Sequence, residues 1–178
     1  ITHWGISEAT EDYLRRAHAV CPVTAVQNRY SMMARQNAAL FPVLEELNVG
    51  FVAFSPMANG LLTGAYGRDD HFDPKLDYRS ATPQFTPKAA DENRELLKML
   101  RDLAEQKHAT PAQLSLAWML CKKPYIVPIP GSRKVERMRE NAGAAEVNLS
   151  AAEVAQIDHI LETIPMSAVF GGSKVNRK

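Results

Sequence analysis

The sequence predicts an α/β fold built on a parallel sheet. Short apolar runs alternate with helical patterns along most of the chain, as expected for four consecutive strand–helix units. The run at residues 49–56 (VGFVAFSP) is nearly all apolar, which is typical of a parallel strand covered on both faces. Right-handed crossovers then leave two topologies, a doubly wound sheet or part of a barrel, and the spacing alone does not choose between them.

The composition describes a single globular domain. The 178 residues are 46% hydrophobic, and no apolar run approaches the ~18 residues that a membrane-spanning helix needs. The formal net charge is +1 and there is no long basic run, so we expect neither nucleic acid nor a membrane as partner. Cys21 and Cys121 lie far apart and outside any metal-ligand spacing, so we expect reduced thiols, a cytoplasmic location and no metal site. The chain opens on Ile1 within an apolar segment and without a targeting signal, so we expect that residues upstream are missing.

Three strands and two helices are expected in the first third of the chain. Residues 1–7, 23–30 and 49–56 are the predicted strands, with one helix beginning at Glu8 and another ending near Asn48. Apolar residues recur at helical spacing in both helices: Tyr13, Ala17 and Val20 in the first, and Leu40, Leu44 and Leu47 in the second. Pro42 is compatible with the second helix only in its first turn.

The remainder begins with residues 57–89, an irregular stretch rich in Gly, Pro, Asp and Arg that we interpret as a long active-site loop. A helix follows over residues 91–107, and a second starts at Thr110-Pro111, a favourable N-cap and N1 pair. Residues 125–130 are the fourth strand, and Ser150 with Glu153 forms a capping box for a last helix. We expect residues 165–178 to be a mobile tail. The predicted inward-facing residues of these helices are Leu96, Leu100, Leu103, Leu114, Ala117, Trp118, Cys121, Val154, Ile157 and Leu161.

Residues 125–143 (YIVPIPGSRKVERMRENAG) indicate a strand, a tight turn and a helix with Val135, Met138 and Ala142 on one side. The first turn of such a helix has unpaired N–H groups and the positive end of a dipole, which stabilise an anion. Ser132 is suited both to cap the helix and to donate to a phosphate oxygen, and Arg133 and Arg137 are suited to charge-assisted contacts. The alternative is an ordinary turn before a helix with a solvated basic face.

Five motifs in a fixed order resemble a known family. HWGISEA, AVQNRYS, FVAFSP with GLLTG, TPAQLSLAWML and IPGSRKVERMRENAGA are similar to the second half of an NADP(H)-dependent aldo-keto reductase, over residues 1–164. The resemblance implies a TIM-type (βα)8 barrel, of which the chain supplies strands five to eight and an extra C-terminal helix. A complete barrel takes roughly 250 residues, so the length fits half of one. The missing N-terminal half, or a homodimer partner, would complete the barrel.

The resemblance also assigns a cofactor site at the carboxyl ends of the strands. It implies that Ser7 and Gln27 bind the nicotinamide carboxamide and that Phe54 stacks on the ring. It assigns the pyrophosphate to Ser55, Met57, Gly60, Leu62 and Thr63. It assigns the 2′-phosphate to Ser132, Arg133 and Arg137, and the adenine to Glu140 and Asn141. Arginine suits a dianionic phosphate, which favours NADP over NAD.

The general acid that the family uses, a tyrosine assisted by a lysine, an aspartate and a histidine, belongs to the first half of the barrel and has no match here. His3-Trp4 is better interpreted as the start of a strand. Asp73 and Tyr78 have a suitable spacing but lie in the irregular loop. We therefore expect no catalytic residue on this chain, and the isolated chain to be inactive.

Reduction of aldehydes or ketones with NADPH by the complete protein is the resulting expectation, with a small carbonyl compound as substrate. An alternative is an NADP(H)-binding regulatory subunit of the same fold without catalysis of its own. A third reading, an unrelated doubly wound nucleotide-binding domain, predicts a G-x-G-x-x-G turn after the first strand, and Gly5-Ile6-Ser7-Glu8 lacks it.

Overall fold

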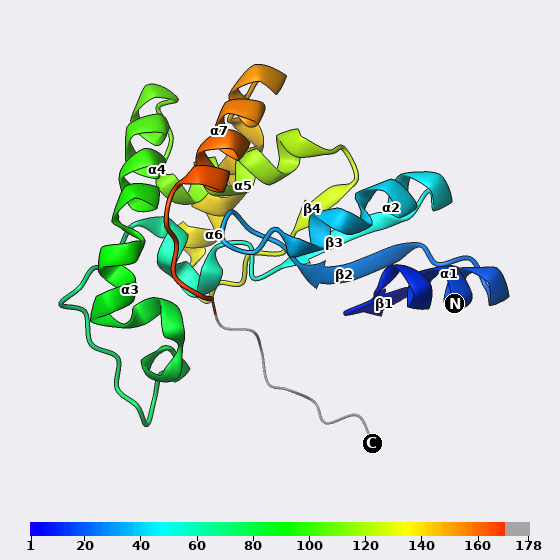
Figure 1. Cartoon of the computed structure of the whole chain (residues 1–178), viewed down its shortest axis with the longest axis horizontal. Coiled ribbons are helices and arrows are strands. Elements are labelled where there is room, and N and C mark those ends of the chain that lie inside the picture. Colours follow the sequence, from blue (N-terminus) through cyan, green and yellow to red (C-terminus); the bar gives the residue numbers. More distant parts are fainter. Residues whose placement is uncertain (170–178) are drawn as a thin grey trace.

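Four parallel strands form one sheet, in the order β1-β2-β3-β4, in a computed structural model that describes residues 1–169. The strands are short and lie inside the predicted runs: β1 Gly5–Ser7, β2 Ala25–Arg29, β3 Gly50–Phe54 and β4 Ile126–Pro128. Their register aligns Ser7 with Gln27, Gln27 with Val52, and Val52 with Val127. The predicted α/β fold with a parallel sheet is thus confirmed (Figure 1).

Helices follow each strand and gather beside β4, where α5 packs against α4, α7 and the strand itself (Figure 1). The α-helices are α1 Glu11–Val20, α2 Phe41–Leu47, α3 Pro87–Glu92, α4 Arg94–Gln106, α5 Pro111–Lys122, α6 Val135–Ala142 and α7 Ala151–Thr163. Short 3₁₀ helices lie between them: η1 Gln36–Leu40, η2 Ala58–Thr63, η3 Tyr78–Ala81, η4 Pro83–Phe85 and η5 Gly143–Glu146. Both predicted helix starts with strong caps are confirmed, because Thr110 with Gln113 and Ser150 with Glu153 form capping boxes.

The two faces of the sheet differ sharply. Val26, Phe51 and Ile126 are buried on the helix-covered face, where the Tyr30 ring stacks on Trp118 at 5.4 Å between centroids. The opposite face carries Gln27, which is exposed, and Val127, which is 55% exposed. The expectation that β3 is covered on both faces therefore holds for one face, since Val52 and Phe54 are only half-buried in the described part of the chain.

The buried face of α1 differs from the prediction. Leu14 is fully buried, whereas Tyr13 is 49% and Val20 90% exposed. Asn28 holds the backbone of Ala9 through both its side-chain oxygen and its side-chain nitrogen, at 3.1 and 2.9 Å. These two hydrogen bonds fix the position of the residues just before α1 relative to β2. As a result, Leu14 instead of Tyr13 is buried against the sheet.

Three further expectations need correction. Residues 57–89 are not irregular throughout, because η2, η3, η4 and the start of α3 lie within them, and α3 begins with Thr86 as N-cap and Pro87 in the first turn. Cys121 is exposed, since the last turn of α5 extends beyond the core. Val135 and Met138 on α6 are more than half exposed, so this apolar side of the helix has no cover among residues 1–169.

The chain after α7 is anchored for a short distance. Ser167 is 9% exposed, accepts a hydrogen bond from Asn93 Nδ2 at 2.8 Å and donates its N–H to Asn93 Oδ1 at 2.9 Å. The start of the predicted mobile tail is therefore held against the N-terminus of α4, while residues 170–178 lie outside the described part of the chain.

Among the described residues, every helix is too short or too polar to cross a membrane.

Candidate functional site

A cavity of about 520 Å³ lies beyond the carboxyl ends of β3 and β4. Its walls come from the turn after β3, from η3 in the 57–89 stretch, and from the turn and helix after β4. The lining residues are Ser55, Pro56, Met57, Asn59, Gly60, Thr63, Ala65, Tyr66, Tyr78, Arg79, Ala112, Ile129, Pro130, Gly131, Ser132, Arg137, Glu140 and Asn141. We refer to this space as the strand-end cavity.

The turn after β3 forms one wall and has an unusual backbone. Ser55, Ala58 and Asn59 all have positive φ values, and Gly60 reaches +100°. A Cβ atom at Gly60 would also lie 3.2 Å from the Tyr66 ring, so both the backbone conformation and the available space favour glycine there. The turn is closed by the Gly60 N–H on Met57 O at 2.9 Å and by the Thr63 hydroxyl on Gly60 O at 2.6 Å. This wall is therefore a compact backbone surface.

The opposite wall is basic. Arg137 lines the cavity from α6 and has no ion-pair partner among residues 1–169. Ser132 lines it too, but the predicted helix cap at this residue is wrong, because the N-cap of α6 is Lys134, two residues later. The Ser132 hydroxyl instead accepts the Lys134 N–H at 3.1 Å and so shapes the turn. Arg133 is exposed and lies outside the lining.

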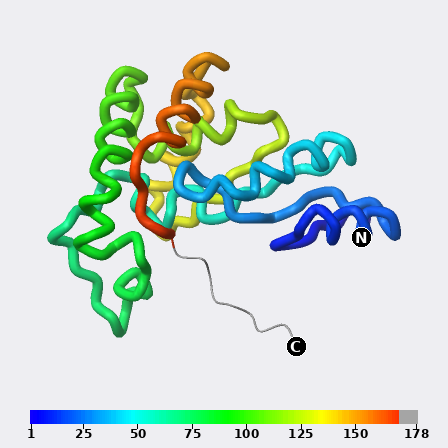
Figure 2. Tube along the Cα trace, viewed as in Figure 1, coloured from blue at the N-terminus to red at the C-terminus, as the bar shows by residue number. Residues whose placement is uncertain are grey.

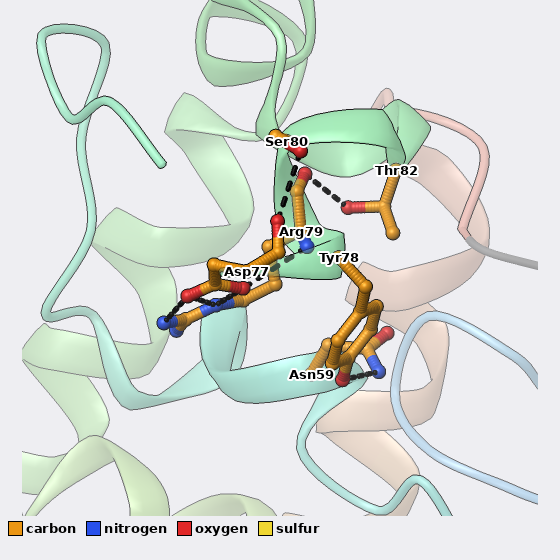
Figure 3. Close-up of polar contacts among 6 residues, drawn as sticks. All are labelled: Asn59, Asp77, Tyr78, Arg79, Ser80 and Thr82. Carbon is orange, nitrogen blue, oxygen red and sulfur yellow. Dashed lines mark hydrogen bonds and ion pairs between the residues drawn. The ribbon is translucent and has the colours of Figure 1, made fainter. Parts of the chain in front are cut away.

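The third wall is η3, which several polar contacts hold in place (Figure 3). Arg79 Nε and Nη2 donate to the two carboxylate oxygens of Asp77, at 2.9 and 2.5 Å. The guanidinium carbon of Arg79 also lies 4.7 Å from the Tyr66 ring centroid and 4.3 Å from that of Phe72. The hydrogen bonds from Arg79 hold the pKa of Asp77 below its usual range, with a smaller contribution from the charge of Arg133. Tyr78 accepts a 2.8 Å hydrogen bond from Asn59, which joins η3 to η2 (Figure 3).

The residues predicted to meet the nicotinamide lie outside the strand-end cavity, on the open face of the sheet. Ser7 ends β1 and donates its hydroxyl to Gln27 O at 3.2 Å, and the Gln27 side chain is exposed beside it. The guanidinium carbon of Arg29 lies 5.2 Å from the centroid of the Phe54 ring. Burial lowers the pKa of Arg29, and the charge of Glu8 partly offsets this. The Phe54 ring is thus in contact with a cation that no sequence motif indicates.

The structure gathers most of the predicted site residues around one space. Ser55, Met57, Gly60, Thr63, Ser132, Arg137, Glu140 and Asn141 all line the strand-end cavity, whereas Ser7, Gln27, Phe54, Leu62 and Arg133 do not. Leu62 is fully buried in the core and its N–H is bonded to Met57 O. The β3 turn presents backbone groups to the cavity, and Arg137 on the facing wall has no acidic partner among residues 1–169. This combination fits a phosphorylated ligand such as the predicted dinucleotide.

Tyr66, Tyr78 and Arg79 were missed as lining residues. Tyr66 and Arg79 belong to no motif in the 57–89 stretch, and Tyr78 was noted only for its spacing from Asp73. The position of η3 beside η2 brings Tyr78 and Arg79 to the cavity. Tyr78 therefore lies at the site, and its hydroxyl accepts a hydrogen bond from Asn59. His3 is exposed, precedes β1 and contacts Thr2. Within residues 1–169 no group of His, Cys, Asp and Glu side chains is arranged to hold a metal ion.

Comparison with known proteins shows the family of the chain. The model of the aldo/keto reductase family matches residues 1–162. The chain belongs to the aldo/keto reductase family. It is 37% identical over 166 residues to the aldo-keto reductase str7 of Strobilurus tenacellus, covering 91% of this chain and 49% of that protein. It is 38% identical over 161 residues to the aldo-keto reductase yakc [NADP(+)] of Schizosaccharomyces pombe, covering 88% of this chain and 47% of that protein.

A solved structure supports the same assignment. The thermostable aldo-keto reductase Tm1743, crystallised with the inhibitor epalrestat, superposes with a TM-score of 0.66 at 25% identity. The match covers 89% of this aldo/keto reductase chain and 48% of the other. The chain therefore spans about half the length of the relatives it matches.

Proposed function

We propose that the complete protein reduces aldehydes or ketones with NADPH, and that this chain is the C-terminal half of its (βα)8 barrel, carrying most of the cofactor site. The single observation that carries the proposal is the strand-end cavity, where a turn of backbone groups faces Arg137 and Ser132. The NADP(+) in the name of the Schizosaccharomyces pombe relative supports the choice of cofactor.

The sheet supports the half-barrel part of the proposal. Among the described residues, β1 and β4 each pair with one strand only, so both edges of the sheet have free backbone groups. The face that carries Gln27 and Val127 is open, as the interior face of a barrel is when half of its strands are absent. A further half-barrel, or a second copy of the chain, would cover these surfaces.

The residues of the chain then have defined roles. Ser132, Arg133 and Arg137 hold the 2′-phosphate, the β3 turn from Ser55 to Thr63 holds the pyrophosphate, and Glu140 with Asn141 contacts the adenine. Ser7 and Gln27 orient the carboxamide, and Phe54 supports one face of the nicotinamide ring. NADPH supplies the hydride. No proton donor to the carbonyl oxygen is assigned within residues 1–169, and we place it on the other half of the barrel.

The test uses the full-length protein, NADPH and a panel of aldehydes and ketones, with cofactor oxidation followed by its fluorescence. We expect turnover with some members of the panel and none with the 178 residues alone. Absence of cofactor oxidation with every compound would contradict the proposal. If NADPH binds but no compound is reduced, a regulatory subunit of the same fold is the better description.

A further inference from the structure

A second cavity, of about 350 Å³, lies between parts of the 57–89 stretch and α3 and α4. It is bounded by the chain after η2 and by α3 and α4, which Figure 2 shows running one after the other in green. Its lining residues are Leu61, Gly64, Ala65, Tyr66, Gly67, Arg68, Gln84, Phe85, Thr86, Ala90, Asp91, Arg94, Leu97 and Arg101. We refer to it as the α3–α4 cavity.

The rim of the α3–α4 cavity is strongly basic. Arg68 and Arg94 both pair with Asp91, at 2.8 and 2.6 Å, one on each carboxylate oxygen. Arg101 is exposed and has no acidic partner among residues 1–169. Arg94 and Arg101 are seven residues apart on α4 and therefore lie on one face of the helix. The three arginines outnumber the single acidic residue, so the rim has a net positive charge.

The floor of the cavity is apolar. Leu61 and Leu97 are 3% and 8% exposed, and Phe85 lies beside them with its ring 5.7 Å from that of Tyr66. Leu97 falls between Arg94 and Arg101 along the same face of α4, so the basic rim and the apolar floor are adjacent. The volume is within the range of small-molecule sites, which typically combine apolar walls with a few polar groups.

Tyr66 and Ala65 separate this space from the strand-end cavity, since both residues line both cavities. Arg79, which contacts the Tyr66 ring, lines only the strand-end cavity. Arg137, the basic residue of the first site, is likewise absent from the second lining. The two cavities can therefore be distinguished by separate arginine substitutions.

We propose that the α3–α4 cavity is a binding site for a small amphiphilic carboxylate, whose anionic group pairs with Arg101 and Arg94 and whose aromatic or aliphatic body lies on Leu61, Leu97 and Phe85. The unpaired Arg101 attracts the anion, because the charge of Asp91 is already shared by Arg68 and Arg94. The floor stabilises the apolar body by removing it from water.

The probe is 2-naphthoate, titrated calorimetrically into the intact protein and compared with the uncharged 2-naphthamide. We expect saturable binding of the carboxylate, about ten-fold weaker binding of the amide, and a loss of about ten-fold in naphthoate affinity in Arg101→Gln. Arg94→Gln provides an independent variant with an effect in the same direction. Arg16→Gln is the matched control, because Arg16 pairs with Asp12 at the surface of α1, away from both cavities.

Each contrary result has a defined meaning. Equal affinity for naphthoate and naphthamide would overturn the role of the basic rim. Equal behaviour of Arg101→Gln and Arg16→Gln, with both variants folded by circular dichroism, would overturn the assignment of the anion to Arg101. Loss of naphthoate binding in Arg137→Gln and not in Arg101→Gln would place the ligand in the strand-end cavity and overturn the second site.

Discussion

Two tyrosine hydroxyls in the aromatic core have opposite environments. The Tyr30 hydroxyl is buried without a hydrogen-bond partner among the described residues, and burial raises its pKa. The Tyr125 hydroxyl donates to Glu45 Oε1 at 2.8 Å, and Lys123 binds the same carboxylate. A buried polar group without a partner retains its full cost of desolvation, whereas a bonded one recovers part of it.

Removing each hydroxyl should therefore change stability in opposite directions. We expect Tyr30→Phe to raise the free energy of unfolding by about 1 kcal/mol, because the ring and its stacking on Trp118 remain. Tyr125→Phe should lower it, because the bond to Glu45 is lost. Urea unfolding of both variants provides the measurement. If Tyr30→Phe is destabilised like Tyr125→Phe, the Tyr30 hydroxyl has a partner outside residues 1–169.

Some residues of the candidate site could be predicted from the sequence, and others could not. Ser55, Gly60, Ser132 and Arg137 were assigned to one site by motif, and the fold brings them to one cavity. Arg29 was missed, because only the pairing of Arg29 with Phe54 across β2 and β3 places the two side chains together. That register depends on the whole sheet and is not encoded in either motif.

Among the elements, α7 is the clearest case of local sequence determining structure. Ser150 Oγ accepts the Glu153 N–H at 3.3 Å, and Glu153 Oε2 accepts the Ser150 N–H at 2.8 Å. Lys107, from the end of α4, pairs with the other oxygen of Glu153 at 2.5 Å. The bond to Lys107, followed by those to Ser150, lowers the pKa of Glu153 to about 2 from its usual value of 4.5.

This shift has a consequence for acid stability. A carboxyl group with a lowered pKa in the folded state stabilises the fold above its unfolded pKa, and that contribution is lost as the pH falls through the folded value. We expect the contribution of Glu153 to disappear between about pH 4.5 and 2. Glu153→Gln, which retains a capping group, should make unfolding less dependent on pH in that window. Urea unfolding at several pH values tests this, and an unchanged profile in the variant would contradict it.

The elements also show why some boundaries were predictable and others were not. Thr110 with Pro111 and Ser150 with Glu153 are local signals, so α5 and α7 begin where the sequence places them. Ser132 resembles a cap, but its hydroxyl accepts the Lys134 N–H and the chain bends at Arg133 before α6 begins at Val135. The contacts of Arg79 in η3 with the rings of Tyr66 and Phe72 leave no periodic pattern in the sequence, so the position of η3 was not predicted.

The whole molecule has apolar surface that its described residues leave exposed. Val127 and Ile129 at β4 and Val135 and Met138 on α6 are between 44% and 59% exposed. These side chains and the free edges of β1 and β4 need to be covered, because burying such surface offsets the entropy that the chain loses when it folds. We expect the 178 residues, when purified alone, to dimerise, to aggregate or to remain partly disordered.

Sedimentation velocity combined with thermal unfolding measures this state directly. A monodisperse monomer with one cooperative unfolding transition would contradict the half-barrel assignment. The full-length protein serves as control, because its additional strands should cover the same surfaces and give a cooperative transition.

Titration of NADPH and NADH into the full-length protein tests most directly whether the basic wall of the strand-end cavity binds the 2′-phosphate of NADP. Arg137→Glu should weaken NADPH binding by about ten- to a hundred-fold and NADH binding much less, because only NADPH carries the phosphate. Arg139→Glu is the matched control, on the same helix but outside the cavity lining, and should affect both cofactors little. An equal loss of affinity for both cofactors in Arg137→Glu would contradict the assignment.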